Sequence, residues 1–330
     1  MKKEALFQEK VNEKTVKCNL CPHNCEISVN STGICQVRKN QNGKLYSLNY
    51  GKISSIGIDP IEKKPLYHFY PGSEILSLGS YGCNFHCDFC QNWQISQKKP
   101  HTKSLEPKEV IKLAKDKGVK SIAYTYSEPL VWYEFIKDTA KLAKKEGLKN
   151  VLVTNGYINQ KPLKELLKYI DAANVDLKSF NNKFYKRYAA ANVNPVKKSI
   201  KTMAEYIHIE ITTLIIGGIN SDLDELSKLF SWIANIDKSI PLHLSRYFPA
   251  YKMDKEATKI SIMEEAYEKA TEKLEYVYLG NIRNTKKNNT YCPKCGEELI
   301  IRNSYKTKNK LNKANCSNCD YEIYGEYLSN

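Results

Sequence analysis

The grouping of the eleven cysteines restricts what this chain can fold into more than any other feature of the sequence. They form a group of four near the N-terminus, a group of three after residue 80 and a group of four near the C-terminus. Four Cys-x-x-Cys pairs occur, whereas a random arrangement would contain about 0.4. Residues 1–14 lack the apolar core of a secretory signal, which indicates a cytoplasmic protein. In a reducing compartment, cysteines in such pairs are metal ligands more often than disulfides, so the sequence predicts three metal sites.

The composition excludes several classes of protein. The 330 residues are 42% hydrophobic and 11% aromatic, which suits a packed core and argues against intrinsic disorder. No apolar run approaches the length of about 18 residues that a membrane-spanning helix needs, so no membrane partner is expected. The net charge is +15. Because the lysines are spread along the chain, a solvated basic surface is the favoured explanation, and an acidic or polyanionic partner is the alternative.

Between residues 73 and 284, short apolar runs alternate with stretches of helical periodicity. The apolar runs cover residues 75–80, 121–126, 151–154, 173–177, 207–216, 241–245 and 276–279. The helical stretches cover residues 107–117, 130–146, 161–170, 195–205, 221–234 and 261–273. This alternation predicts parallel βαβ units with right-handed crossovers. Because the runs fall short of the eight strands of a closed barrel, we expect an α/β fold with a partial (βα)6-type TIM barrel, and a doubly wound sheet is the alternative.

Two shorter segments flank this region. We therefore expect three domains: an N-terminal cysteine-rich segment (1–72), the barrel (73–284) and a C-terminal zinc ribbon (285–330). In the N-terminal segment, Asn42-Gly43 predicts a two-residue β-hairpin. Residues 285–290, TKKNNT, have the composition of a linker.

The first apolar run of the expected barrel leads into a loop that carries Cys83, Cys87 and Cys90 with the spacing C-x3-C-x2-C. A loop after a barrel strand lies on the face where active sites are built. Three thiolates can ligate three irons of a [4Fe–4S] cluster and leave the fourth iron open for chemistry. A zinc site with His86 as the fourth ligand is the alternative.

This loop resembles the cluster-binding motif of radical S-adenosylmethionine (SAM) enzymes, in which an aromatic residue such as Phe89 precedes the last cysteine. Later segments resemble glycyl-radical activating enzymes of the pyruvate formate-lyase type, in the same order along the chain. The resemblance implies that three segments contact SAM. Tyr126-Ser127-Glu128-Pro129 is similar to the Gly-Gly-Glu that holds the SAM amino group. Thr154-Asn155-Gly156 is similar to their Thr-Asn-Gly, and Asp176-Leu177-Lys178 is similar to their Asp-Leu-Lys.

Each of these segments also has an ordinary structural explanation. Glu128, before Pro129, suits the first turn of a helix. Asn155-Gly156 is a common turn signal. Asp176 and Lys178 lie two residues apart on one strand face and can form a salt bridge.

The chain departs from the activating enzymes at two positions. Val153 stands where they carry an Asp of a monovalent-cation site, so the resemblance does not extend to that site. Their late SAM-contacting histidine has no counterpart in the matching place. His243 and Thr212, on neighbouring expected strands, are instead candidates for contacts with SAM or substrate.

With the flanking segments CNLCPHNCEI and DPIEKKPLYHFYPG, the chain resembles the radical SAM member of the AmmeMemoRadiSam system, which is named for its association with AMMECR and Memo-type proteins. The resemblance implies a [4Fe–4S] cluster that cleaves SAM reductively to a 5′-deoxyadenosyl radical, which takes hydrogen from a substrate. The resemblance to the activating enzymes implies a protein or peptide substrate and an electron donor such as ferredoxin or flavodoxin. The resemblance to the AmmeMemoRadiSam member implies AMMECR- or Memo-type partners. Modification of a small molecule or of RNA is the alternative. Because the radical breaks the C–H bond, no catalytic side chain is expected beyond the cluster.

The two outer cysteine groups predict further metal sites. Cys292, Cys295, Cys316 and Cys319 form two pairs that predict a zinc ribbon, with a rubredoxin-like iron as the alternative. Such a ribbon would also suit a protein of another class, a nucleic-acid-binding protein. A second closed site is predicted in the N-terminal segment, for which zinc and an auxiliary [4Fe–4S] cluster fit equally; its ligands are Cys18, Cys21, Cys25 and Cys35.

Overall fold

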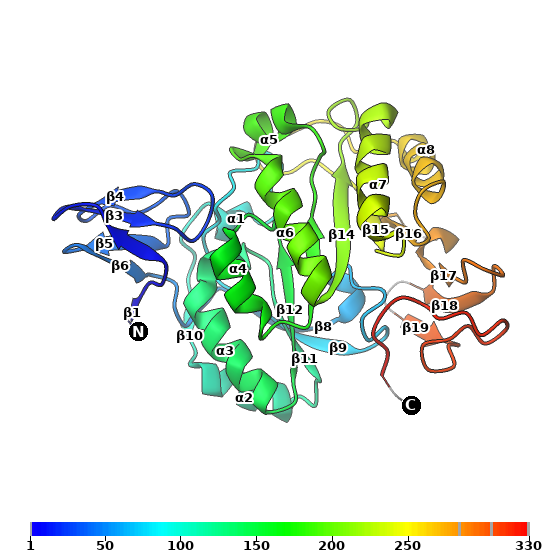
Figure 1. Cartoon of the computed structure of the whole chain (residues 1–330), viewed down its shortest axis with the longest axis horizontal. Coiled ribbons are helices and arrows are strands. Elements are labelled where there is room, and N and C mark those ends of the chain that lie inside the picture. Colours follow the sequence, from blue (N-terminus) through cyan, green and yellow to red (C-terminus); the bar gives the residue numbers. More distant parts are fainter. Residues whose placement is uncertain (1, 283–284, 304–305, 329–330) are drawn as a thin grey trace.

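In the part of the chain that the structure describes, eight strands form one central sheet (Figure 1). The computed structural model describes residues 2–282, 285–303 and 306–328. Across the sheet, the order is β16 (Val277–Gly280), β15 (Leu242–Arg246), β14 (His208–Ile215), β13 (Ala172–Asp176), β12 (Lys149–Thr154), β11 (Ser121–Tyr124), β9 (Glu74–Gly79) and β8 (Ser55–Pro60). The strands from β9 to β16 are parallel, and β8 pairs with β9 in the antiparallel sense.

The strands follow one another across the sheet in chain order. A doubly wound sheet would reverse its order at a switch point, so that alternative is excluded for the described strands. The seven expected apolar runs correspond to the seven parallel strands, which confirms the predicted α/β fold with a parallel sheet. The partial barrel concerns the curvature of this sheet and stays a prediction. The edge strand β8 was not expected, because its residues are only partly buried and show no apolar run.

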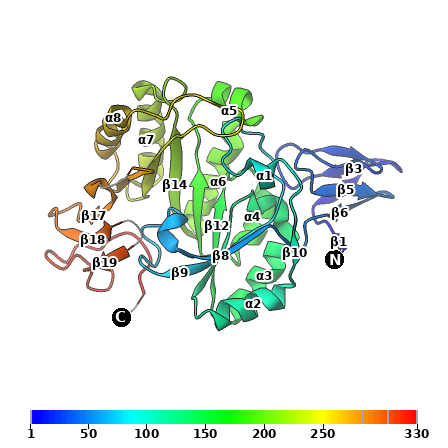
Figure 2. The same cartoon turned by 180° about the vertical axis from the view of Figure 1, so that it is seen from behind.

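The helices between these strands cover one face of the sheet, nearest the viewer in Figure 1, and Figure 2 shows the other face. They are α2 (Pro107–Asp116), α3 (Tyr133–Lys145), α4 (Gln160–Leu167), α6 (Val193–Tyr206), α7 (Leu223–Asp237) and α8 (Ile260–Thr271). Pro107 at the first position and the Glu106–Glu109 capping box begin α2, and Gly118 follows its end with φ +67°. Shorter helices are η1 (Ile61–Lys63), α1 (Trp93–Ser96), η2 (Pro129–Trp132) and α5 (Asn182–Ala189).

The N-terminal segment consists of two small antiparallel sheets at one end of the molecule (Figure 1). The first joins β1 (Lys3–Glu4), β6 (Lys44–Ser47) and β5 (Arg38–Gln41); the second joins β2 (Gln8–Lys10), β3 (Thr15–Cys18) and β4 (Glu26–Ser28). The pairing of Gln41 with Lys44 across Asn42 and Gly43, both at positive φ, confirms the predicted hairpin. A short ribbon of β7 (Lys52–Ile53) and β10 (Lys103–Ser104) follows.

The C-terminal segment packs on the other end of the central sheet. Its strands β17 (Thr290–Tyr291), β18 (Glu298–Asn303) and β19 (Lys306–Asn309) form an antiparallel sheet. Leu299 and Ile300 share an apolar cluster with Tyr276 and Tyr278 at β16. The expected linker instead contains η3 (Lys286–Asn288) and the start of β17, while the expected domain end at residue 284 lies outside the described residues.

No helix in the described part of the chain combines the length and the apolar character that crossing a membrane requires.

Candidate functional site

The loop after β9 carries three thiols at the carboxyl ends of the parallel strands; Cys87 is buried, and Cys83 and Cys90 are half-buried. Burial raises the pKa of the Cys83 thiol well above its ordinary value and that of Cys87 to about 12. Thiolates at this depth therefore need a cation beside them, as in a metal centre. The alternative zinc ligand, His86, points elsewhere: its Nδ1 lies 2.6 Å from Oε1 of Gln97.

A cavity of about 270 Å³ opens beside this loop. Because the strands are parallel, their carboxyl ends bring residues far apart in the sequence to one edge of the sheet. The cavity lining contains all three cysteines and all but one of the residues predicted to contact SAM: Phe89, Ser127, Glu128, Thr154, Asn155, Asp176, Lys178 and Thr212. His243 is the exception. That these residues hold the cofactor stays a prediction.

Glu128 lies under this cavity with its carboxylate buried. One oxygen accepts hydrogen bonds from the backbone N–H of Leu130 (2.9 Å) and from Oγ1 of Thr154 (2.6 Å). The other accepts from the backbone N–H of Asn155 (2.8 Å). Burial outweighs these bonds and raises the pKa of Glu128 to about 7. The carboxylate therefore caps η2, in agreement with the helix-start role that the sequence offered for Glu128. It also joins the loop after β11 to the end of β12.

Asn155 connects this carboxylate to the cysteine loop. Its side-chain amide donates to Oδ1 of Asn84 (2.9 Å) and approaches Sγ of Cys83 (3.8 Å). Asn84 in turn donates to the carbonyl oxygen of Tyr157 (2.8 Å). Sequence reasoning gave Asn84 no role; its position directly after Cys83 was the available signal.

Asp176 and Lys178 form an ion pair, with Nζ of Lys178 at 2.9 Å from Oδ2 of Asp176. Side-chain exposure is 15% for Lys178 and 37% for Asp176, so both charges reach the cavity. The salt bridge that the sequence left as the alternative is thus present. It is compatible with SAM binding, because a ligand with an ammonium and a carboxylate can take up either partner.

A second cavity of about 880 Å³ adjoins the first and shares Gln91, Thr212, Ser245 and Asn281 with it. Its walls come from η1 and the loop after it, from the ends of β14 to β16, and from the C-terminal segment, including Asn289 and Arg302. His243 lines this cavity. The two cavities together provide space for a cofactor and a second molecule side by side.

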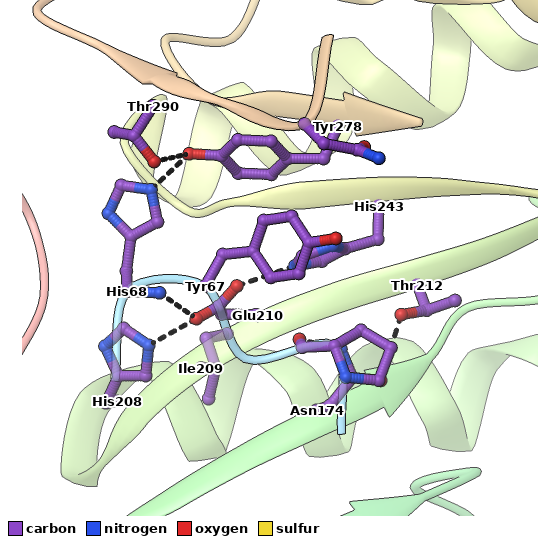
Figure 3. Close-up of polar contacts among 12 residues, drawn as sticks. Tyr67, His68, Asn174, His208, Ile209, Glu210, Thr212, His243, Tyr278 and Thr290 are labelled. Atoms are coloured by element: carbon purple, nitrogen blue, oxygen red, sulfur yellow. Dashed lines mark hydrogen bonds and ion pairs between the residues drawn. The ribbon is translucent and has the colours of Figure 1, made fainter. Parts of the chain in front are cut away.

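Behind the larger cavity lies a buried network around Glu210 (Figure 3). The Glu210 carboxylate contacts Nε2 of His243 (2.6 Å), Nε2 of His208 (3.2 Å) and the backbone N–H of His68 (2.7 Å). Burial alone would raise its pKa, but the bonds from the two histidines outweigh burial and lower it. Nε2 of His68 lies 2.5 Å from the Tyr278 hydroxyl. The sequence had marked His243 but could not show that the carboxylate of Glu210 joins it to His208 on the same strand and to His68, 142 residues away.

The C-terminal cysteines form a compact site. The thiols of Cys292, Cys295, Cys316 and Cys319 all lie within 4.8 Å of one another. The Sγ atoms are 3.6 Å apart for Cys292 and Cys319 and 3.7 Å apart for Cys295 and Cys316. A tetrahedral ion with metal–sulfur bonds of about 2.3 Å separates its ligands by about 3.8 Å. These four residues are therefore arranged for a single metal ion.

Comparison with known proteins identifies the family to which the chain is similar. The Radical SAM superfamily matches residues 78–233. The chain is 42% identical over 313 residues to Uncharacterized protein MJ0808 of Methanocaldococcus jannaschii, with 93% of both chains covered. It is 25% identical over 175 residues to Pyruvate formate-lyase 1-activating enzyme of Escherichia coli K12, covering 49% of this chain and 71% of that enzyme. The structure of SuiB from Streptococcus suis has the same fold, with a TM-score of 0.50 and 16% identity over 67% of this chain and 52% of SuiB.

The chain therefore belongs to the radical SAM superfamily, and the protein is a radical SAM enzyme, an oxidoreductase related to pyruvate formate-lyase activating enzymes. Membership implies a [4Fe–4S] cluster and SAM as cofactors.

Proposed function

We propose that the enzyme binds its cluster at Cys83, Cys87 and Cys90, binds SAM in the 270 Å³ cavity and acts on a substrate held in the 880 Å³ cavity. The continuity of the two cavities through four shared residues carries this proposal. The donor set fits a cluster with one open iron, because the lining of the smaller cavity contains three thiols and no histidine or further cysteine. Bound there, the cluster and SAM supply a one-electron cleavage that yields methionine and a 5′-deoxyadenosyl radical.

The chain's own residues position these groups. Glu128, Thr154 and Asn155 form the frame that fixes the cysteine loop against the ends of β11 and β12. Asp176 and Lys178 take up the charged groups of SAM, and Phe89, Ser127 and Thr212 complete the cavity wall. The partly buried position of the thiols limits the access of water and of other reactants to a radical.

For the substrate, we favour a protein or peptide. The support is the similarity to an enzyme whose name states that it activates another enzyme, pyruvate formate-lyase. A small molecule is the second candidate, and the size of the larger cavity favours it, because ligand cavities measure about 300–1,000 Å³. RNA is the third. We further propose a ferredoxin or flavodoxin as the electron donor. Motif resemblance also supports membership of the AmmeMemoRadiSam system with AMMECR- or Memo-type partners, and a partial-barrel curvature of the sheet.

We propose zinc for the C-terminal site, where the sulfur spacing suits a tetrahedral ion, and an iron ion remains the alternative. The segment has a structural part in the active site: Arg302 lines the larger cavity, and its guanidinium donates to the carbonyl oxygen of Tyr67 (2.7 Å). This engagement argues against a free nucleic-acid-binding ribbon.

Deuterium transfer can identify the substrate class. Extract from deuterated cells of the source organism is separated by ultrafiltration into macromolecules and small molecules, and each fraction is given to the reconstituted enzyme with SAM and dithionite under nitrogen. Deuterium in 5′-deoxyadenosine, measured by mass spectrometry, is expected with the macromolecules and should disappear after prior protease treatment. Label that comes from the small molecules, or disappears only after ribonuclease, selects one of the other candidates. A Cys83→Ala/Cys87→Ala/Cys90→Ala variant should form no 5′-deoxyadenosine at all.

A further inference from the structure

The three cysteine groups differ in how closely their thiols gather. Among the described residues, only the C-terminal group has three or more ligand atoms that all lie within 4.8 Å of one another. The group that the superfamily uses for its cluster, Cys83, Cys87 and Cys90, is wider than this. The N-terminal group, Cys18, Cys21, Cys25 and Cys35, is wider as well. The molecule therefore contains one compact arrangement and two expanded ones.

The N-terminal thiols stand too far apart to share a single ion. All four line a cavity of about 10 Å³, which is room for about one water molecule. The sulfur ligands of one zinc ion lie about 3.8 Å apart, well inside the 4.8 Å limit that the N-terminal group exceeds. In a cubane cluster, by contrast, each cysteine binds a different iron, so the thiols stand farther from the centre.

The surroundings of these thiols suit an anionic centre. The rest of the cavity wall is largely apolar, with Leu20, Ile27, Ile34 and Val131. Arg38 is buried beside it, and its guanidinium approaches Sγ of Cys18 (3.8 Å) and pairs with Glu134.

The N-terminal group also touches the radical SAM loop. A Cβ placed on Gly82, the residue before Cys83, would lie 2.6 Å from the carbonyl oxygen of Cys35, so the two backbones are in direct contact. On the other side of the loop, Nε2 of His23 lies 2.8 Å from the carbonyl oxygen of Asn84. Gly82 and Asn84, on either side of Cys83, are thus both in contact with the N-terminal group or the loop that carries it.

We propose that Cys18, Cys21, Cys25 and Cys35 bind a second [4Fe–4S] cluster, fully ligated by cysteine and close enough to the first for their electron spins to interact. The proposal rests on the proposed function only in using the first cluster as a neighbour. It assigns iron to the N-terminal group, for which the sequence left zinc and iron–sulfur open.

Metal content tests the assignment directly. Reconstituted full-length protein should contain about eight iron and eight sulfide ions and about one zinc ion per chain. Cys21→Ser/Cys25→Ser should lower iron and sulfide to about four each and leave zinc unchanged. About four iron with about two zinc ions in the wild type would assign zinc to the N-terminal group and overturn the proposal. About four iron with one zinc would overturn it too, since the group would then bind nothing.

The Cys83→Ala/Cys87→Ala/Cys90→Ala variant separates this proposal from the proposed function. It should retain about four iron ions, and its electron paramagnetic resonance (EPR) signal after reduction should not change when SAM is added, because no iron is open. If this variant keeps all the iron of the wild type, the proposed function fails at its cluster site. If it loses all iron, the second cluster is refuted.

Spin coupling tests the proximity without any variant that could fail to fold. The EPR spectrum of fully reduced wild-type protein should be broadened and split by the neighbouring cluster. A spectrum of one isolated cluster, or the plain sum of two, would contradict the contact between the sites.

Discussion

The backbone N–H of Asn155 donates a 2.8 Å hydrogen bond to the buried carboxylate of Glu128, and this bond ties the end of β12 to the loop that follows β11. The side-chain amide of Asn155 reaches in the other direction, to Asn84 and towards Cys83. One residue therefore links a strand end, a buried carboxylate and the cysteine loop. Glu128 and Cys83 are therefore connected through a single residue.

Glu128→Gln should remove a pH dependence of stability. Burial raises the pKa of Glu128 from 4.5 to about 7, so the carboxyl ionises more easily in the unfolded chain. The wild type therefore loses stability as the pH rises through this interval, whereas Gln does not titrate. Between about pH 5.5 and 8, the free energy of unfolding of the wild type should fall by about 2 kcal/mol relative to the variant.

At every pH, the free energy of unfolding of Glu128→Gln should also be about 1–3 kcal/mol lower than expected from titration alone. The reason is that the Gln NH₂ group cannot accept the hydrogen bonds that one carboxylate oxygen receives. Urea unfolding followed by tryptophan fluorescence at several pH values measures both effects. Glu205→Gln, which changes an exposed carboxylate, provides the matched control and should leave the profile unchanged. Parallel profiles for the wild type and Glu128→Gln would show that this carboxyl keeps its ordinary pKa in the fold.

Asp176→Asn and Lys178→Ala should weaken SAM binding while the visible spectrum of the cluster stays intact. If the pair holds SAM as proposed, each variant removes one charge-assisted hydrogen bond to SAM and leaves the partner charge of the ion pair poorly compensated. The loss of about 1.5–3 kcal/mol corresponds to an affinity about ten- to over a hundredfold lower. Equilibrium binding of SAM to the reconstituted variants under nitrogen measures the effect.

Lys149→Ala is the control for these two variants. Lys149 forms a similar ion pair with Asp171 (3.1 Å), but at the start of β12, the end of the strand away from the cavity. Its loss should not change SAM affinity. Wild-type affinity in Asp176→Asn and Lys178→Ala as well would mean that their pair is only a strand-end salt bridge.

The sequence predicted the parts of the molecule in which local pattern and tertiary role coincide. Each parallel strand is an apolar run bounded by turn signals, and each predicted SAM-contacting segment begins at the end of such a run. Parallel pairing then brings those segments together without further information, which is why Glu128, Thr154 and Asp176 line one cavity. The hairpin at Asn42-Gly43 is of the same kind, because the turn geometry is local.

Other features depend on contacts that no local pattern encodes. The edge strand β8 pairs with only one other strand and is only partly buried, so its sequence does not need an apolar run. The approach of His68 to Glu210, 142 residues apart, follows from how the loop after η1 lies against β14. Cysteine spacing likewise gives the number of ligands at a site but not the distance between the thiols, which here separates the compact group from the expanded ones.

Cys316→Ser should remove the C-terminal metal and disturb the larger cavity without unloading the first cluster. The ion holds together a segment whose own core is small, so its loss should unfold β17 to β19 locally. Because Asn289 and Arg302 line the larger cavity, deuterium transfer from substrate should be lost while SAM cleavage without substrate persists. Zinc analysis together with 5′-deoxyadenosine formation checks both parts. Unchanged deuterium transfer in a zinc-free variant would contradict a structural part for this segment in the substrate site.

His243→Ala should leave SAM affinity unchanged and lower hydrogen transfer from the substrate. His243 lines the larger cavity and not the one beside the cysteines, so SAM should not depend on it unless SAM extends across the shared residues. Losing its hydrogen bond to Glu210 also leaves a buried carboxylate short of one donor, which should reduce stability by about 3–5 kcal/mol.

His243→Gln separates the two effects, because an amide can still donate to Glu210. We expect His243→Gln to regain most of the stability while deuterium transfer remains about tenfold or more below wild type, as for the loss of one good substrate contact. A fall in SAM affinity in both variants, comparable to that of Asp176→Asn, would instead place His243 among the SAM ligands, as its sequence position first suggested.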